Sequence, residues 1–264
     1  MLKLKPAFHL LLILFLLTFQ FVKAQINSVK NIPTVWSKIE AYTPTLVALP
    51  NNYDSTKEHT LIISLHGYGG TAEGNLRWLS KPFTDAGFIF ASPQGPYPVL
   101  LDNGKLVYEW FLYDISSFIM LERPASKLEI AAMRTTSENQ MGQVISDLKD
   151  KYKVDKIYFA GFSQGGIITY LTSIHHHDKI DGMIIFSSVV DEDWLGNDNI
   201  EDGKGVRTLI IQGEQDKLVP IRLAENGRDL LLENGYDVTY KKFNGEHTVP
   251  KHLMDFVIDW IGEK

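Results

Sequence analysis

A serine lies at the centre of residues 161–165, Gly-Phe-Ser-Gln-Gly, which fit the pattern G-x-S-x-G. The five residues directly follow the apolar run 157–160 and directly precede a segment with helical spacing. A nucleophilic serine of this pattern requires a strand, a sharp turn and a helix in this order. The turn would lift the hydroxyl of Ser163 clear of the sheet, and the helix start would offer N–H groups to a developing negative charge. The pattern predicts nucleophilic catalysis by Ser163, against the alternative of a glycine-rich turn with a helix-capping serine.

A nucleophilic serine needs a base, and the base needs an acid that orients it. His247 lies in a loop between the last predicted strand and the last predicted helix, and Asp216 follows the apolar run 208–211. Both loops come at the C-terminal ends of strands, where ligands meet an open α/β sheet. The order serine, acid, histidine along the chain fits a hydrolase with a catalytic triad. Glu214 is the rival for the acid, and its position alone makes it second to Asp216.

Two backbone N–H groups are predicted to stabilise the oxyanion. One belongs to Gln164, directly after the serine, and the other to Tyr68 in the glycine-rich turn 66–70. The glycines of this turn would let the backbone approach a substrate closely. His66 precedes the serine and sits at a strand end, so we interpret it as a buried structural histidine.

The remaining candidate residues favour simpler explanations. His175, His176 and His177 end the helix after the serine, and a solvated helix terminus explains them better than a metal or pH-sensing site. His252 falls on the predicted final helix and is interpreted as structural or exposed. The acids Asp191 and Asp193 follow the fourth strand and are weaker candidates than Asp216. No metal site is predicted.

Short, continuous apolar runs alternate with segments of helical spacing. This is typical of buried parallel strands joined by crossover helices. The predicted fold class is α/β, a mostly parallel sheet with helices on both faces, and residues 25–264 are expected to form one domain. One or two edge strands are expected within 25–60. The predicted strands are 61–65, 88–91, 157–160, 183–186, 208–211 and 238–243, and the predicted helices are 75–86, 137–152, 167–174, 221–233 and 250–261.

An insertion at about 98–136 interrupts this alternation. It contains a turn signal at 102–104 and then several aromatic residues. A loop this long inside a compact domain is usually functional. Its aromatics could line a substrate pocket or form a small packed core of their own.

The N-terminus and the composition limit where the protein works and what it binds. Lys3 and Lys5 precede the apolar run 10–17, and small residues at 22 and 24 complete a secretory signal with cleavage after Ala24. The run is shorter than the roughly 20 apolar residues of a membrane span, which favours a cleaved signal over the alternative of an uncleaved anchor. The chain has 26 Lys and Arg against 32 Asp and Glu, no long basic stretch, and no cysteine. This argues against nucleic-acid binding, and it excludes disulfides, thiol nucleophiles and thiolate metal sites.

Four segments together resemble the carboxylesterase/phospholipase group of α/β-hydrolases, which includes acyl-protein thioesterases, lysophospholipases and small bacterial esterases. The resemblance covers about residues 58–262, and the block 161–166 is its most specific part. It implies Ser163, Asp216 and His247 as the catalytic triad, with Tyr68 and Gln164 as oxyanion donors. Trp110 and Phe111 resemble an aromatic pair near the active site, which implies a contact with substrate. The segments are 65–69, 161–166, 213–220 and 245–247.

The leading hypothesis is a secreted or periplasmic serine esterase that needs no cofactor and acts on a small-molecule, glycan or lipid ester. A lysophospholipase or acyl thioesterase is the first alternative and would need an apolar channel, for which the insertion offers the only candidates. A peptidase on the same fold and a catalytically inactive binding protein are further alternatives. No nucleic-acid partner and no stable membrane insertion after signal cleavage are expected.

Overall fold

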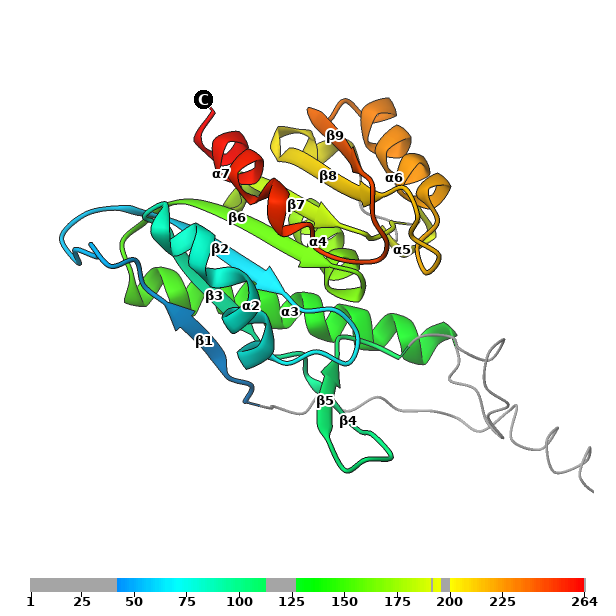
Figure 1. Cartoon of the computed structure of the whole chain (residues 1–264), viewed down its shortest axis with the longest axis horizontal. Helices are drawn as coiled ribbons and strands as arrows, with labels where there is room; N and C mark the ends of the chain where they lie inside the picture. The colour runs from blue at the N-terminus through cyan, green and yellow to red at the C-terminus, as the bar shows by residue number, and fades with distance from the viewer. Residues whose placement is uncertain (1–41, 113–126, 191, 196–199, 264) are drawn as a thin grey trace, which may run out of the picture. The chain divides into compact units, whose positions relative to one another are not determined.

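The protein is described here by a computed structural model, in which residues 42–112, 127–190, 192–195 and 200–263 are described. The predicted signal segment 1–24 lies outside these residues. A seven-stranded sheet runs in the order β1-β3-β2-β6-β7-β8-β9 (Figure 1). Every neighbouring pair is parallel except β1 and β3. The strands are β1 (Thr45–Ala48), β2 (His59–Leu65), β3 (Ile89–Pro93), β6 (Val154–Phe162), β7 (Gly182–Phe186), β8 (Arg207–Gly213) and β9 (Val238–Phe243).

Helices cover both faces of the sheet, as expected. Helices α2 (Ala72–Asp85) and α7 (Met254–Gly262) pack on one face, and α3 (Lys127–Lys151), α4 (Gln164–His175) and α6 (Ile221–Glu233) pack on the other (Figure 1). The continuous apolar strands supply both faces because successive side chains point to opposite sides. In β2, for example, Leu61 and Ile63 join the core under α3 and α4, whereas Ile62 joins the core under α2 and α7. The predicted fold class is therefore confirmed.

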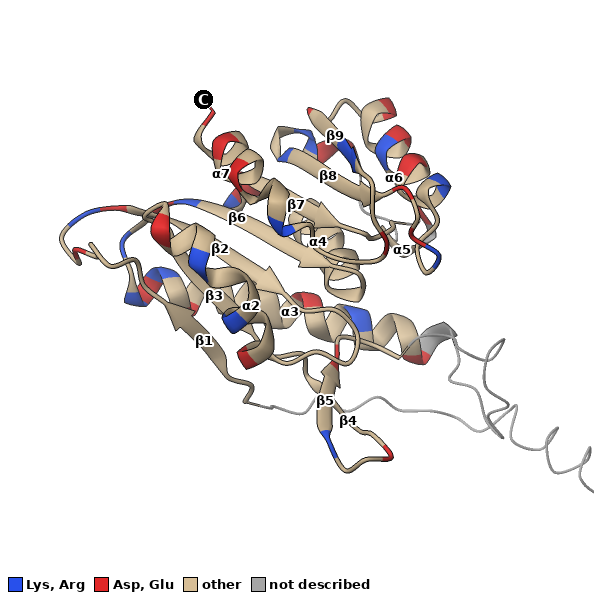
Figure 2. Ribbon diagram, viewed as in Figure 1, with Lys and Arg blue, Asp and Glu red and all other residues tan. Residues whose placement is uncertain are grey.

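Short elements complete the described chain. They are the single helical turn α5 (Glu192–Leu195) and the 3-10 turns η1 (His177–Lys179), η2 (Ile200–Gly205) and η3 (Lys251–Leu253). Figure 2 shows that the strands at the centre of the sheet carry few charged side chains, and that charges of both signs are mixed along the helices. No described helix has the length and the apolar character that crossing a membrane would require.

The segment expected as an insertion contains two regular elements. Strands β4 (Tyr97–Leu100) and β5 (Leu106–Glu109) form an antiparallel hairpin around the predicted turn. Helix α3 begins at Lys127, ten residues before the predicted start of this helix at 137. The prediction of this helix start was wrong, because the first turns of α3 are too weakly amphipathic to be recognised by periodicity. Residues 113–126 lie outside the described residues.

Candidate active site

Ser163 lies on the sharp turn between β6 and α4, as its pattern predicts. Its backbone is strained, with φ 53° and ψ −120°. Such strain in a residue other than glycine is common at functional sites. The turn is possible only because its flanking glycines lack side chains: a Cβ on Gly161 would collide with Thr169 Oγ1, and a Cβ on Gly165 would lie 2.5 Å from the carbonyl oxygen of Leu65. Ser163 remains half-buried and so is open to solvent on one side.

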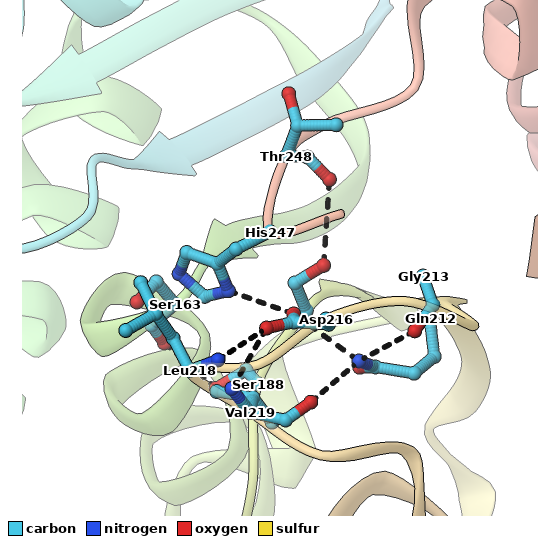
Figure 3. Close-up of polar contacts among 10 residues, drawn as sticks. Ser163, Ser188, Gln212, Gly213, Asp216, Leu218, Val219, His247 and Thr248 are labelled. Atoms are coloured by element: carbon cyan, nitrogen blue, oxygen red, sulfur yellow. Dashed lines mark hydrogen bonds and ion pairs between the residues drawn. The ribbon is translucent and has the colours of Figure 1, made fainter. Parts of the chain in front are cut away.

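The side chains of His247 and Asp216 meet at the carboxyl edge of the sheet. His247 Nδ1 lies 2.8 Å from Asp216 Oδ2. The other carboxylate oxygen, Oδ1, accepts the backbone N–H groups of Leu218 at 2.9 Å and Val219 at 2.8 Å (Figure 3). The Asp216 side chain is fully buried, so this orientation is fixed. The rival Glu214 is exposed.

The imidazole of His247 is held between Asp216 and the turn that carries Ser163. In Figure 3 the ring edge opposite Nδ1, which carries Nε2, points toward Ser163. The ring of Phe162 packs against the imidazole with centroids 4.7 Å apart. An acceptor on Nδ1 favours the tautomer with its proton on that atom, which leaves Nε2 as a proton acceptor. The arrangement can therefore activate a serine hydroxyl.

The glycine-rich turn after β2 lies directly against the Ser163 turn. A Cβ on Gly67 would lie 3.4 Å from Ser163 Cβ and 2.9 Å from the ring of Phe162. The hairpin fixes this turn from the outside, since Gly69 N–H donates to the Tyr108 carbonyl and Tyr108 N–H donates to the Gly70 carbonyl, both at 3.0 Å. The structure thus places the backbone around Tyr68 and Gln164 next to Ser163, where oxyanion donors are needed.

His66 is a buried structural residue, as interpreted from sequence. Its Nε2 accepts from Gly95 N–H at 3.1 Å and from the Gln94 amide at 3.1 Å, and Gln94 is oriented by its bond to Ala72 N–H. Its Nδ1 therefore carries the proton and donates to the Gly67 carbonyl at 2.8 Å. Burial lowers the pKa of His66 to about 4, so the ring is neutral at pH 7.

Trp110 and Phe111 lie under the site as buried residues of the hydrophobic core. Gln164 holds their backbone: its side-chain oxygen accepts Trp110 N–H at 2.9 Å, and its side-chain nitrogen donates to the Phe111 carbonyl at 2.6 Å. The structure thus shows both rings as packing residues, and their contact with substrate stays a prediction.

Two further residues support this site, and the sequence reasoning missed them. Ser188 Oγ donates to the Ser163 carbonyl at 2.7 Å, and Gln212 Nε2 donates to Asp216 Oδ2 at 3.2 Å. Both follow or end buried strands at the carboxyl edge, and that position could have identified them. Glu109, the last residue of β5, is a separate case: its side chain is buried, and no hydrogen bond or ion pair to its carboxyl is found among the described residues. Burial raises the pKa of Glu109 to about 7.

The prediction of a solvated histidine cluster was wrong for its first member. His175 Nδ1 contacts Glu138 Oε2 at 2.6 Å, with only 16% of the His175 side chain exposed. The reason is that α3 packs beside α4 and buries this end of the helix, which periodicity could not show. His176 is half-buried, and His177 and His252 are exposed. No metal-binding group of three acids or histidines occurs within the described ranges. The weaker acid candidates, Asp191 and the side chain of Asp193, lie outside them.

Comparison with known proteins places this geometry in a family. Residues 52–263 match the phospholipase/carboxylesterase family. The chain belongs to that family. A probable carboxylesterase SOBER1-like of Arabidopsis thaliana is 24% identical over 211 residues, which cover 78% of this chain and 79% of that protein. Acyl-protein thioesterase 1 of Neurospora crassa is 25% identical over 213 residues, which cover 77% of this chain and 86% of that protein.

Solved structures show the same fold. Esterase PE8 superposes with a TM-score of 0.63 at 22% identity, covering 85% of this chain and 99% of that chain. The Bacillus cereus carboxylesterase gives a TM-score of 0.63 at 19% identity, covering 84% and 94% of the two chains. Membership of the phospholipase/carboxylesterase family and the α/β-hydrolase fold are confirmed, and so is the expected class of enzyme, a carboxylic ester hydrolase.

Proposed function

We propose that this family member is an exported serine esterase in which Ser163, His247 and Asp216 form the catalytic triad. The observation that carries the proposal is the 2.8 Å contact between His247 Nδ1 and Asp216 Oδ2, beside a serine on a strained strand-to-helix turn. A serine nucleophile explains the backbone strain at Ser163. A triad also explains why the Asp216 carboxylate is held by hydrogen bonds from the protein beside His247.

In the first step, His247 Nε2 takes the proton of Ser163 Oγ while Oγ attacks the ester carbonyl carbon. The carbonyl oxygen becomes an oxyanion that the backbone N–H groups of Tyr68 and Gln164 stabilise. The C–O bond to the alcohol then breaks, and His247 returns the proton to the leaving alkoxide. The product is an acyl-enzyme on Ser163 and a free alcohol.

In the second step, His247 takes a proton from water while the water oxygen attacks the acyl carbon. The ester bond to Ser163 breaks, and the proton returns to Oγ, which releases a carboxylic acid. Asp216 stays ionised throughout, because it holds the Nδ1 proton in place and stabilises the imidazolium that forms. Neither step uses a metal or an organic cofactor.

A thioester is the second candidate substrate, since the same two steps release a thiol in place of an alcohol. The likeness to a protein named acyl-protein thioesterase 1 supports it. The secretory pattern at residues 1–24 supports an ester met outside the cytoplasm, with a small-molecule, glycan or lipid alcohol.

Hydrolysis of chromogenic esters from acetyl to palmitoyl, by residues 25–264 with and without Ser163→Ala, tests the proposal. We expect the protein to hydrolyse these esters and Ser163→Ala to abolish the activity. An optimum at short acyl chains would fit a soluble or glycan ester as the substrate. A long-chain optimum would favour a lipid ester, and faster turnover of matched thioesters would favour the second candidate. Full activity in folded Ser163→Ala would overturn the triad. Secretion of the full chain and the mass of the released protein test export and cleavage after Ala24.

A further inference from the structure

Trp110 is bonded to three separate elements around the site. Its backbone N–H donates to the Gln164 side chain at 2.9 Å, and its carbonyl accepts from Ser137 Oγ of α3 at 2.5 Å. Its indole Nε1–H donates to the carbonyl of His66 at 2.8 Å. The indole is fully buried and packs on the His66 ring with centroids 5.0 Å apart. One residue therefore connects the turn after β2, the start of α4 and the body of α3.

The two connected turns are the ones that carry the proposed oxyanion donors. His66 lies two residues before Tyr68, and Gln164 is itself the second donor residue. The turns also touch directly, because a Cβ on Gly165 would collide with the carbonyl oxygens at the end of β2. That contact limits how closely the turns approach, and hydrogen bonds to Trp110 limit how far they separate.

The two bonds act on opposite sides of the gap. The indole N–H holds the His66 carbonyl, and so fixes where the chain enters the turn that contains Gly67 and Tyr68. The Gln164 side chain, which has no exposed surface, holds the backbone of Trp110 from the start of α4. A shift of either turn must break one of these buried bonds or move the fully buried indole.

We propose that Trp110 is a positioning residue that sets the distance between the N–H groups of Tyr68 and Gln164. The inference rests on the proposed function and adds to it a role for Trp110 that needs no contact with the substrate. Donors stabilise an oxyanion only when they lie within about 2.7–3.1 Å of its position, so a small separation of the turns weakens both bonds in the transition state. Misplacement by about 1 Å can lower a rate about 100-fold.

The test compares three variants on one soluble short-chain ester. Trp110→Phe keeps an aromatic ring and removes the indole N–H, and Gln164→Met keeps the backbone donor and removes the side-chain bonds. In each of these two variants we expect kcat to fall about 30- to 100-fold and KM to change less than about threefold. The reason is that the lost interactions stabilise the transition state and not the bound substrate.

Trp260→Phe is the matched control. Trp260 is also buried, and its indole N–H donates to Thr239 Oγ1 at 3.1 Å, but it belongs to the core under α2 and α7. It should lose thermal stability much as Trp110→Phe does and keep its kcat. The comparison of the two variants separates the general effect of losing a buried indole hydrogen bond from the specific effect of losing the bond made by Trp110.

A thionoester of the same structure gives a readout that stability alone does not change. Its thiocarbonyl sulfur is a poor hydrogen-bond acceptor. Correctly placed N–H groups of Tyr68 and Gln164 therefore accelerate hydrolysis of the ester more than that of the thionoester. The ratio of kcat/KM for ester to thionoester should fall about tenfold in Trp110→Phe and Gln164→Met and stay constant in Trp260→Phe.

The outcomes separate this inference from the proposed function. An unchanged ratio and kcat in folded Trp110→Phe would overturn the positioning role and leave the serine esterase intact. If Trp110→Phe does not fold, Gln164→Met decides by the same criterion. Loss of kcat in Trp260→Phe to the same extent would show a general effect of stability and would also refute the positioning role. Activity that survives Ser163→Ala would instead overturn the proposed function.

Discussion

The substitution Asp216→Asn should nearly abolish turnover, and the geometry around the carboxylate gives the reason. Oδ1 accepts two backbone N–H groups, so the amide oxygen of asparagine must take that place. The NH2 group then takes the place of Oδ2, 2.8 Å from His247 Nδ1 and 3.2 Å from the Gln212 amide nitrogen. Both contacts would bring two donors together, and the one with His247 is relieved only if Nδ1 gives up its proton.

The consequence is the wrong tautomer of His247. With its proton on Nε2, the ring cannot accept the proton of Ser163. Loss of the correct histidine tautomer lowers kcat about 10,000-fold in a Ser-His-Asp triad. This corresponds to an increase of about 5 kcal/mol in activation free energy. The backbone bonds to Oδ1 are retained, so we expect the variant to remain folded.

The assay is kcat on a soluble short-chain chromogenic ester, with thermal unfolding followed by circular dichroism. Glu214→Gln is the control, because it makes the same acid-to-amide change two residues away at an exposed position. It should leave kcat within about twofold, as surface changes away from a site do. A folded Asp216→Asn with kcat within tenfold of the unchanged enzyme would refute the tautomer argument, and a large loss in Glu214→Gln would transfer the role to that residue.

Three further predictions concern stability. The pKa of Glu109 is raised to about 7, so the folded protein keeps a proton that the unfolded chain loses near pH 4.5. The free energy of unfolding should therefore fall by about 2 kcal/mol between pH 5 and 8. Urea unfolding of Glu109→Gln should lack this decline. The pKa of His66 is lowered to about 4, so stability present above pH 6.5 should fall by about 2 kcal/mol as the pH drops to 4.5, and His66→Gln should lack that component. Gly165→Ala should cost about 3 kcal/mol or prevent folding, because its Cβ meets backbone oxygens, whereas Gly205→Ala, with no atom within 4 Å of the new Cβ, should unfold like the unchanged protein.

Much of the fold follows from local patterns. Continuous apolar runs bounded by glycine and proline predicted the parallel strands, and helix α6 occupies the predicted residues 221–233. The prediction failed where packing decides. The hairpin β4–β5 pairs with the turn after β2 through Gly70 and Tyr108, and α3 packs on α4. Contacts between residues so far apart in the chain do not show in the periodicity of the sequence.

The candidate site divides in the same way. By itself the sequence determined that Ser163 follows a strand and starts a helix, and that Asp216 and His247 follow later strands. Parallel strands end at one edge of a sheet, so these facts bring the three residues to one region. Position along the chain is enough to propose a catalytic triad and to rank Asp216 above Glu214, but it does not show which carboxylate contacts His247.

Only the tertiary structure decided which side chains touch. The backbone of Leu218 and Val219 turns back onto Asp216 and aims its second oxygen at His247, and Glu214 faces solvent. The same holds for Trp110, whose burial and bonds place it beneath the turns that carry Tyr68 and Gln164. Hydrogen bonds depend on distances of tenths of an ångström between residues far apart in the chain. Those distances are set by how the elements pack, so residue types and spacing alone do not contain them.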